Sequence, residues 1–431
     1  MNRALQRRQS PLVRMLSPLR DFLQTEASGA ALLAASALVA MVWANSPWSQ
    51  SYVRLWASHI DISVAGHVLN LDLHQWINDG LMTVFFLVVG LEIKRELTEG
   101  HLASKRSALL PAAAAIGGMV APALIYLAIA GGSAPRGWAV PVATDIALAI
   151  GVLAVAGSRL PASLRAFLLG LAIVDDIGAI LIIAAVYSTG VSWSWLLTGA
   201  LGIVLTVAVR RLGFTSLAVY VPIGAGVWLC LHNAGIHPTI VGVIMGLLAP
   251  AVPRLQPDLI DVDELVDLSS FEAARTTSDL ARGSISVVEW LQHVLHPWTS
   301  YLIVPIFALA NSGIELSSAG LRSAFHSPIT WGVLTGLVVG KPIGVVFATR
   351  MAARAGVADL PDAATGRQLV GVGSAAGIGF TVAIFIAELA FTNTVDRSNA
   401  KLAILVASVL AAISATLILT LRPRPALIKA S

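Results

Sequence analysis

The sequence predicts an all-α polytopic membrane protein with twelve transmembrane helices, and three observations carry this prediction. Of the 431 residues, 56% are hydrophobic and only 12% are charged, whereas a soluble domain carries about 25% charged residues. Apolar runs long enough to cross a bilayer recur along the whole chain. The basic residues gather in every second connection between those runs.

The predicted helices follow from the length of each apolar run, because a transmembrane helix needs about 20 predominantly apolar residues. A basic cytoplasmic tail at 1–26 is similar to the start of a signal peptide, but the run behind it is too long for one. We therefore expect an uncleaved first helix and a transporter domain over 27–421. The predicted helices are 27–45, 76–93, 108–130, 138–156, 163–188, 194–209, 217–231, 236–250, 298–314, 328–349, 368–391 and 401–421, and a tail follows at 422–431.

The charges test this count through the positive-inside rule, which places Lys and Arg in cytoplasmic connections. With twelve helices and both termini inside, 22 basic residues lie on the cytoplasmic side, five lie outside, and the last of the 28, Lys341, lies in the middle of a helix. If one helix had been missed, every later connection would be assigned to the wrong side and this bias would be lost. The net charge of +4 therefore reflects the cytoplasmic connections and does not indicate a nucleic-acid partner.

Two connections are long enough to carry structure of their own. Residues 60–73, IDISVAGHVLNLDL, alternate apolar and polar side chains around Ala65-Gly66, which predicts a small β-hairpin on the outer side. A lone hairpin is marginal in water, so we expect it to pair, for example with a second copy of itself. Residues 251–297 are predicted as an acidic cytoplasmic loop that ends in a short amphipathic helix, SVVEWLQHVLHPW.

Five ionisable residues lie inside predicted helices and away from their ends. A charge at mid-membrane costs about 2.5–3.5 kcal/mol on insertion scales, so each such residue is a functional candidate. A buried ion pair that only fixes helix packing is the alternative, but a single lysine cannot neutralise three neighbouring carboxylates. The five are Asp145, Asp175, Asp176, Lys341 and Glu388.

Asp175 and Asp176 stand side by side in LLGLAIVDDIGAILIIAAVY, residues 168–187. Neighbours on a helix point about 100° apart, so the two cannot use one partner in the same way, but both can line one water-filled cavity. Two carboxylates in one cavity repel each other, which favours the binding of a proton. Ionised carboxylates are also the oxygen ligands that a hard cation such as Na⁺ prefers. Protons and cation then compete for the same oxygens, which is the chemistry of an antiporter.

Two predicted helices are interrupted in a way that is typical of a transporter binding site. The segment 138–156 contains Pro141 and the polar step Thr144-Asp145, and residues 371–379 hold four glycines. Irregular backbone at this depth is tolerated only against protein or a cavity. The glycines alone are also compatible with close helix packing.

Lys341 and Asp145 are expected to balance the partial charges at the broken helix ends. Asp145 would offset the positive N-terminal ends, and Lys341 would offset the opposite ends. Lys341, in GLVVGKPIGVV, is too far from either end of its helix to snorkel easily. We expect it to be a switchable partner of Asp175, released when the cation arrives.

Six stretches follow one another across nearly the whole chain: WINDGLMTVFFLVVGLEIKREL, PVATDIALAIGVLAV, LAIVDDIGAI, HVLHPW, VGKPIG and GIGFT. Together they resemble the NhaA-type Na⁺/H⁺ antiporters of bacterial inner membranes. The resemblance implies inverted repeats with two crossing, broken helices. It also implies exchange of cytoplasmic Na⁺ or Li⁺ for external protons, with more protons than cations per cycle, and a homodimer that forms through the outer hairpin in the lipid membrane. We expect no cofactor and no enzymatic activity.

The resemblance also implies roles for individual residues. Asp175 and Asp176 would carry the cation and the protons. The implied supporting residues are Lys341, Asp145, Thr144 and Asp79. Control by pH is implied for residues at the cytoplasmic mouth and for a histidine in GIHPT, although interfacial or capping roles for the histidines stay open. The implied pH-sensing residues are Glu92, Lys94, Arg95, Glu96, His293, His296 and His237.

The chain departs from the family pattern at two informative positions. Gln292 stands where the family often has an acidic residue before HVLHPW, and Glu289 lies one turn earlier. We therefore hypothesise an altered pH profile of activity. Glu388 stands where a small or neutral residue is expected. If it faces the cavity, the selectivity among Na⁺, Li⁺ and K⁺ would change.

Two other functions were weighed against antiport. An intramembrane aspartyl protease needs its two aspartates on separate helices and gives Lys341 no role. A transporter of organic anions would favour cationic and aromatic side chains over the pair Asp175-Asp176. Antiport gives a role both to the pair Asp175-Asp176 and to Lys341, so we prefer it to these two functions.

Overall fold

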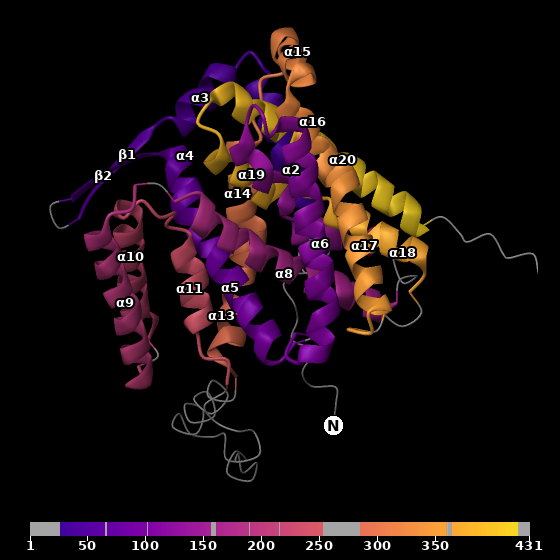
Figure 1. Cartoon of the computed structure of the whole chain (residues 1–431). Coiled ribbons are helices and arrows are strands. Elements are labelled where there is room, and N and C mark those ends of the chain that lie inside the picture. Colours follow the sequence, from indigo (N-terminus) through magenta and orange to yellow (C-terminus); the bar gives the residue numbers. More distant parts are fainter. Residues whose placement is uncertain are drawn as a thin grey trace, which may run out of the picture.

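The computed structural model describes residues 26–64, 67–100, 102–156, 161–188, 190–214, 216–252, 285–358, 360 and 364–420. Helices dominate these residues, and one two-stranded sheet projects from the helical body (Figure 1). Among the described residues, eight helices are long and apolar enough to cross a membrane, or up to ten if each of two bent pairs is one crossing. The predicted tails at 1–26 and 422–431 lie almost entirely outside the described residues.

The N-terminal half, as far as Leu248, contains the hairpin and the segments that carry Asp145, Asp175 and Asp176. In chain order its elements are α2 (Glu26–Ala44), α3 (Ser49–Trp56), β1 (His59–Val64), β2 (His67–Asp72), α4 (Leu73–Gln75), the π-helical η1 (Trp76–Leu81), α5 (Met82–Thr98), α6 (Lys105–Ala130), the 3₁₀-helical η2 (Pro135–Val142), α7 (Ile146–Ala156), α8 (Ala162–Val186), α9 (Trp193–Arg211), α10 (Leu217–Asn233) and α11 (Ile240–Leu248).

The C-terminal half contains two long helices with π-helical turns and the second broken segment. Its elements are α13 (Val287–Trp298), η6 (Thr299–Ile303), α14 (Val304–Asn311), α15 (Ser318–His326), α16 (Pro328–Thr335), η7 (Gly336–Gly340), α17 (Lys341–Arg354), α18 (Gly366–Ala376), α19 (Phe380–Ala390) and α20 (Thr394–Thr420).

Each of the twelve predicted ranges contains a helix in the structure. The predicted membrane-protein class is therefore confirmed. Two of these helices are short: α10 spans 17 residues and α11 only nine. A crossing by either therefore needs the flanking backbone as well, and the count of twelve crossings stays a prediction.

Two boundaries and one additional helix differ from the prediction. The short amphipathic helix was expected to end the loop 251–297, ahead of the predicted helix 298–314, but α13, η6 and α14 form one continuous helix, Val287–Asn311. Its first turns do not lie free, because Val288 and Leu291 are buried against Leu91 of α5. The last long helix, α20, begins at Thr394, ahead of the predicted 401, and the short helix α15 was not predicted.

The predicted hairpin is present as an antiparallel pair, although its turn at Ala65-Gly66 lies outside the described residues. The register joins His59 to Asp72 and Val64 to His67. At its base, Leu71 is buried in a cluster with Val227 and Trp228 of α10. The hairpin therefore rests on the helical body at one end and extends away from it (Figure 1).

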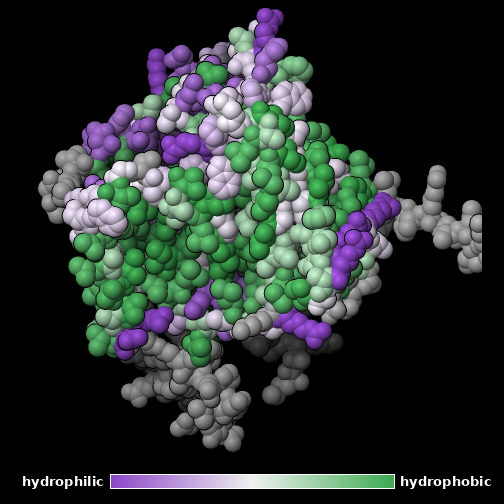
Figure 2. Space-filling model, in the orientation of Figure 1, coloured by the Kyte–Doolittle hydropathy of each residue, from purple (hydrophilic) through white to green (hydrophobic). Residues whose placement is uncertain are grey.

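The surface of the helical body is strongly apolar. Figure 2 shows a broad band of hydrophobic side chains with hydrophilic side chains above and below it. The band includes α9, whose Leu197, Leu201 and Val204 are all exposed. This distribution is the one that a lipid environment requires. We refer to the membrane side that carries the hairpin as the hairpin side.

Candidate functional site

The first broken segment opens between η2 and α7. Pro141 lies in the last turn of η2, and the backbone at Ala143 is extended, with ψ at 150°. The chain becomes helical again only at Ile146. Thr144 and Asp145 therefore sit in a short non-helical stretch, and both are buried.

The second broken segment lies between α18 and α19, which are bent by 46° relative to each other. The break falls at Gly377–Gly379, at the end of the predicted glycine-rich stretch. A Cβ on Gly377 would lie only 2.5 Å from the carbonyl oxygen of Leu337, so the close approach of η7 requires glycine there. The two breaks meet, because the backbone nitrogen of Asp145 donates to the carbonyl of Ile378 at 2.6 Å.

Asp145 satisfies backbone donors at the start of two half-helices. One carboxylate oxygen accepts from the backbone nitrogen of Leu148 in α7 at 3.0 Å. The other accepts from the backbone nitrogen of Thr381 in α19 at 3.0 Å and from its hydroxyl at 2.7 Å. Helix N-termini carry partial positive charge and unpaired N–H groups, so a buried carboxylate is stabilised at this point. The sequence analysis did not single out Thr381, and the signal was its position two residues after Gly379.

Lys341 lies on the opposite side of the crossing and is fully buried. Its Nζ donates to the carbonyl of Val142, the last residue of η2, and to Oδ2 of Asp175 at 2.6 Å. The lysine therefore offsets a helix C-terminal end and one carboxylate at once. Its helix is held close to α6, because a Cβ on Gly344 would clash with the backbone of Gly117.

Asp175 and Asp176 lie in the middle of α8 and are buried, with exposed fractions of 0% and 5%. The hydroxyl of Thr144 lies 2.6 Å from Oδ2 of Asp175 and 2.8 Å from the carbonyl oxygen of Ala376, so it can donate to either. Within the described part of the chain, Oδ1 of Asp175 and Oδ1 of Asp176 have no hydrogen-bond partner. Unpaired carboxylate oxygens on two neighbouring residues are suited to a proton or to a hard cation.

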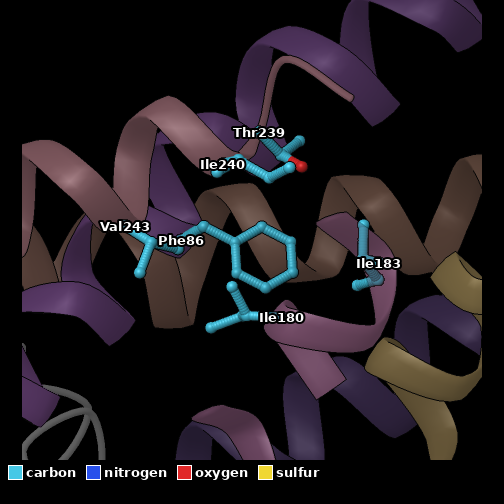
Figure 3. Close-up of a pocket in the computed structure, with 6 residues that line it drawn as sticks. All are labelled: Phe86, Ile180, Ile183, Thr239, Ile240 and Val243. Carbon is cyan, nitrogen blue, oxygen red and sulfur yellow. The ribbon is translucent and has the colours of Figure 1, made fainter. Parts of the chain in front are cut away.

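The predicted water-filled cavity around the aspartates is not open in this conformation. On α8, Ile180 and Ile183 follow Asp176 on the same helix face. Figure 3 shows the ring of Phe86 between these isoleucines and Thr239, in a pocket too narrow for a water molecule. The hairpin side of the aspartates is therefore closed by apolar contacts. The pocket residues are Phe86, Ile180, Ile183, Thr239, Ile240 and Val243.

The residues implied in pH sensing fall into two places. The first group lies at the end of α5 and on α13, which pack against each other. Glu92 is close enough for its charge to act on Asp176, whereas His293 and His296 are exposed. Gln292 has a buried Oε1 without a partner among the described residues, and Glu289 is exposed one turn earlier. The first group consists of Glu92, Lys94, Arg95, Glu96, His293 and His296.

His237 lies apart from that group and beside Asp79. Its Nε2 is 3.4 Å from Oδ1 of Asp79, and Nδ1 of His232 is 3.9 Å from Oδ2 of the same carboxylate. Asp79 was expected to support the aspartate pair. The structure places it in a cluster with two histidines, at the start of the helix that carries Glu92, and its supporting role stays a prediction.

Glu388 does not face the aspartate pair. It lies 3.1 Å from Nη1 of Arg397 and also pairs with Lys401, both at the start of α20. Seven residues separate it from Thr381, which corresponds to about 10 Å along α19. A selectivity role through the cavity is therefore not supported by its position, since its charge is neutralised elsewhere.

The chain is similar over nearly its whole length to known antiporters. The family model described as Na+/H+ antiporter 1 matches residues 20–419. The chain belongs to this antiporter family. It is 44% identical to Na(+)/H(+) antiporter NhaA 2 of Sorangium cellulosum over 427 residues, which covers 96% of this chain and 91% of the relative. It is also 44% identical to Na(+)/H(+) antiporter NhaA of Cupriavidus necator, covering 92% and 88% of the two chains.

A third relative matches over the same part of the chain. Na(+)/H(+) antiporter NhaA of Rhodopirellula baltica is 42% identical over 429 residues, with 96% of both chains covered. The resemblance to NhaA-type antiporters predicted from sequence motifs is therefore confirmed. As a member of the antiporter family, the protein is a transporter and not an enzyme. The aspartates also argue against a protease, because both lie on α8.

Proposed function

We propose that this antiporter exchanges cytoplasmic Na⁺ for external protons, and that Asp175 and Asp176 are the carriers. The observation that carries the proposal is the pair of buried carboxyl groups, each with one unpartnered oxygen among the described residues. A buried polar atom without a partner is costly, so a ligand for these oxygens accounts for their retention. Na⁺, Li⁺ and H⁺ are ligands of this kind.

In the proposed cycle, Lys341 and the cation alternate as partners of Asp175. An arriving Na⁺ displaces the ammonium group, and both carboxylates coordinate the cation. On the other side of the membrane, protons bind to the same carboxyl groups and remove the negative charge that holds Na⁺. Two carboxyl groups take up to two protons in place of one monovalent cation. Exchange therefore moves net charge and is driven by the membrane potential as well as by the proton gradient, which serves Na⁺ and pH homeostasis.

An ion-flux assay tests this proposal directly. Everted membrane vesicles with a pH-sensitive dye are given an imposed proton gradient and then Na⁺, Li⁺ or K⁺. Na⁺ is expected to collapse the gradient, and Asp176→Asn is expected to abolish the response. Glu315→Gln is the matched control, because it makes the same chemical change on an exposed residue far from α8. A full response in Asp176→Asn would overturn the assignment of the carriers.

We place both termini in the cytoplasm and the hairpin outside, in the bacterial inner membrane. This orientation is supported by the 22 basic residues that it assigns to the cytoplasmic side. It makes α8 run from the cytoplasmic to the hairpin side. The apolar contact at Phe86 would then close the external route.

Dimerisation through the hairpin is part of the same proposal. The sheet has two strands, so in the described part of the chain the second edge of each strand has no partner strand, and an added strand from another copy would pair with it. A cysteine in place of the exposed Ile60, in a Cys230→Ser background, tests the contact. Disulfide-linked dimers are expected from Ile60→Cys and not from Leu201→Cys on the lipid-facing side of α9.

Control by pH is proposed for the residues of α5 and α13. The position of Glu92 near Asp176 supports a link between this group and the carriers. Gln292→Glu adds a carboxyl group on α13 and is expected to shift the pH profile of exchange toward that of relatives with Glu there. If exchange by the wild-type protein, by Gln292→Glu and by relatives with Glu there begins over the same pH range, the proposed control by pH at this position is overturned.

A further inference from the structure

A groove on the surface of α17 combines an apolar wall with two arginines. It has a volume of about 380 Å³ and lies between α17 and α18. Its apolar wall is made by side chains from both helices, and its end carries two guanidinium groups. The residues used below are Ile343, Phe347, Met351 and Val370 on the wall and Arg350 and Arg354 at the end.

The residues from α17 share one face of that helix. Residues 343, 347, 350, 351 and 354 follow the spacing of three and four residues that places side chains in one row. Ile343 and Phe347 have exposed fractions of 56% and 65%. The opposite face of α17 is occupied, because Val345 is fully buried there, and on the adjoining face Gly344 lies against the backbone of Gly117 in α6. The groove therefore opens to the surroundings of the helical body.

The basic end of the groove holds more than one guanidinium group. A Cβ on Gly366 would lie 2.9 Å from Nη2 of Arg350, so this side chain lies against the first residue of α18. Arg367 follows directly, and its buried Nη2 has no hydrogen-bond partner in the described ranges. None of the ion pairs between described residues involves Arg350, Arg354 or Arg367. Among the described residues, the charge at this end of the groove is therefore positive.

The length of the groove along α17 matches the thickness of one leaflet of a bilayer. From residue 343 to 354, α17 rises by about 16 Å, which is about half of the hydrocarbon thickness of about 30 Å. Ile343 follows Lys341, which lies at the crossing of the broken helices, and the arginines lie near the end of the span at Arg354. The wall thus has the length of an acyl chain, and the arginines lie at headgroup level.

We propose that this groove binds an anionic phospholipid of the cytoplasmic leaflet. The phosphate would contact Arg350 and Arg354, and one acyl chain would lie along Ile343, Phe347 and Val370. Basic pockets between membrane helices on the cytoplasmic side suit anionic headgroups. The inference rests on the orientation given under Proposed function. A bound lipid would join α17, which carries Lys341, to the start of the broken helix α18.

The test is labelling of the purified full-length protein, in nanodiscs of phosphatidylcholine, by a trace of phosphatidylglycerol with a photoreactive acyl chain. Adducts mapped by peptide mass spectrometry are expected on the α17 peptide that contains Phe347. Arg350→Ala with Arg354→Ala is expected to reduce this labelling about thirtyfold at subsaturating lipid, since each arginine contributes about a factor of five. Arg54→Ala with Arg322→Ala removes two exposed arginines outside the groove and is expected to leave labelling unchanged.

Further arms identify the ligand and separate this test from transport. Photoreactive phosphatidylcholine that labels the same peptide equally would overturn the requirement for an anionic lipid. Displacement by millimolar inorganic phosphate would show a site for soluble anions and would also overturn the proposal. Unchanged labelling in the double arginine variant would do the same. Labelling requires no ion flux, so a protein that fails to exchange Na⁺ leaves this test intact.

Discussion

Thr381 donates two hydrogen bonds to the same carboxylate oxygen of Asp145, at 3.0 Å from its backbone nitrogen and 2.7 Å from its hydroxyl. The two residues are 236 positions apart and lie at the starts of α19 and α7. One side chain therefore fixes the crossing of both interrupted helices. The irregular backbone that frames Asp175 and Asp176 depends on this contact.

Thr381→Val tests the contribution of the hydroxyl at nearly constant shape. A hydrogen bond to a charged group contributes about 1.5–3 kcal/mol, so the free energy of unfolding is expected to fall by about that amount. Thermal unfolding of the purified protein in detergent measures the change. Thr198→Val is the control, because the exposed Thr198 hydroxyl bonds only within α9, to Ser194. Equal effects of the two substitutions would contradict the proposed role of the crossing.

Lys341→Met is expected to destabilise the protein by about 3–5 kcal/mol, because it leaves a buried carboxylate at Asp175 without its charged partner. The loss is expected to be larger at high pH, where Asp175 cannot take a proton instead. Adding Asp175→Asn should recover much of the stability, since the unpaired charge is removed. Neither variant is expected to exchange ions normally. Unfolding curves for the single and double variants at two pH values measure these effects, and a failure of Asp175→Asn to recover stability would argue against the pair.

Competition between protons and Na⁺ predicts a specific pH dependence of transport. The KM for Na⁺ is expected to rise as the pH falls, by up to about tenfold per pH unit for each carboxyl group that must lose its proton. The rate at saturating Na⁺ is expected to change less, because excess cation displaces the protons. Initial rates in proteoliposomes, with Na⁺ varied at several pH values, provide both quantities. A KM that stays constant while the maximal rate changes would exclude a shared site.

Glu388→Gln is expected to lower stability without changing ion selectivity. The substitution leaves Arg397 and Lys401 without their shared carboxylate, which is largely buried. A loss of about 1–3 kcal/mol is expected for partly exposed cations left unpaired. The ratio of Na⁺ to Li⁺ transport rates should stay at the wild-type value, with Glu315→Gln as the exposed control. A changed ratio would place Glu388 on the ion route.

Local sequence signals predicted most of the fold. The spans follow from apolar run length, and both interruptions follow from residues that disfavour helix, Pro141 in one and the glycines around Gly377 in the other. The continuous helix Val287–Asn311 could not be predicted in this way. Its histidines and Glu289 lower the local hydropathy, and only packing against α5 shows that Val288 and Leu291 are buried.

In the candidate site too, some contacts could be predicted from the sequence, whereas others depend on how distant helices pack. The partnership of Lys341 with Asp175 followed from counting charges in an apolar medium, which leaves few choices of partner. The contact of Asp79 with His237 could not be predicted, because it depends on how α11 packs against α5 and on the hydrogen bond from Trp228 of α10 to Thr83 of α5. The closed state at Phe86 depends on three separate helical segments, α5, α8 and α11, and has no local signal.

The tight approach of α6 and α17 at Gly117 and Gly344 has a consequence for how Lys341 works. Two backbones in such contact resist sliding along each other, so we expect α6 and α17 to keep their relative position during the cycle. The ammonium group lies at the end of a flexible four-carbon side chain. We therefore expect a rotamer change of this side chain, without movement of α17 relative to α6, to release Asp175 and to bind it again.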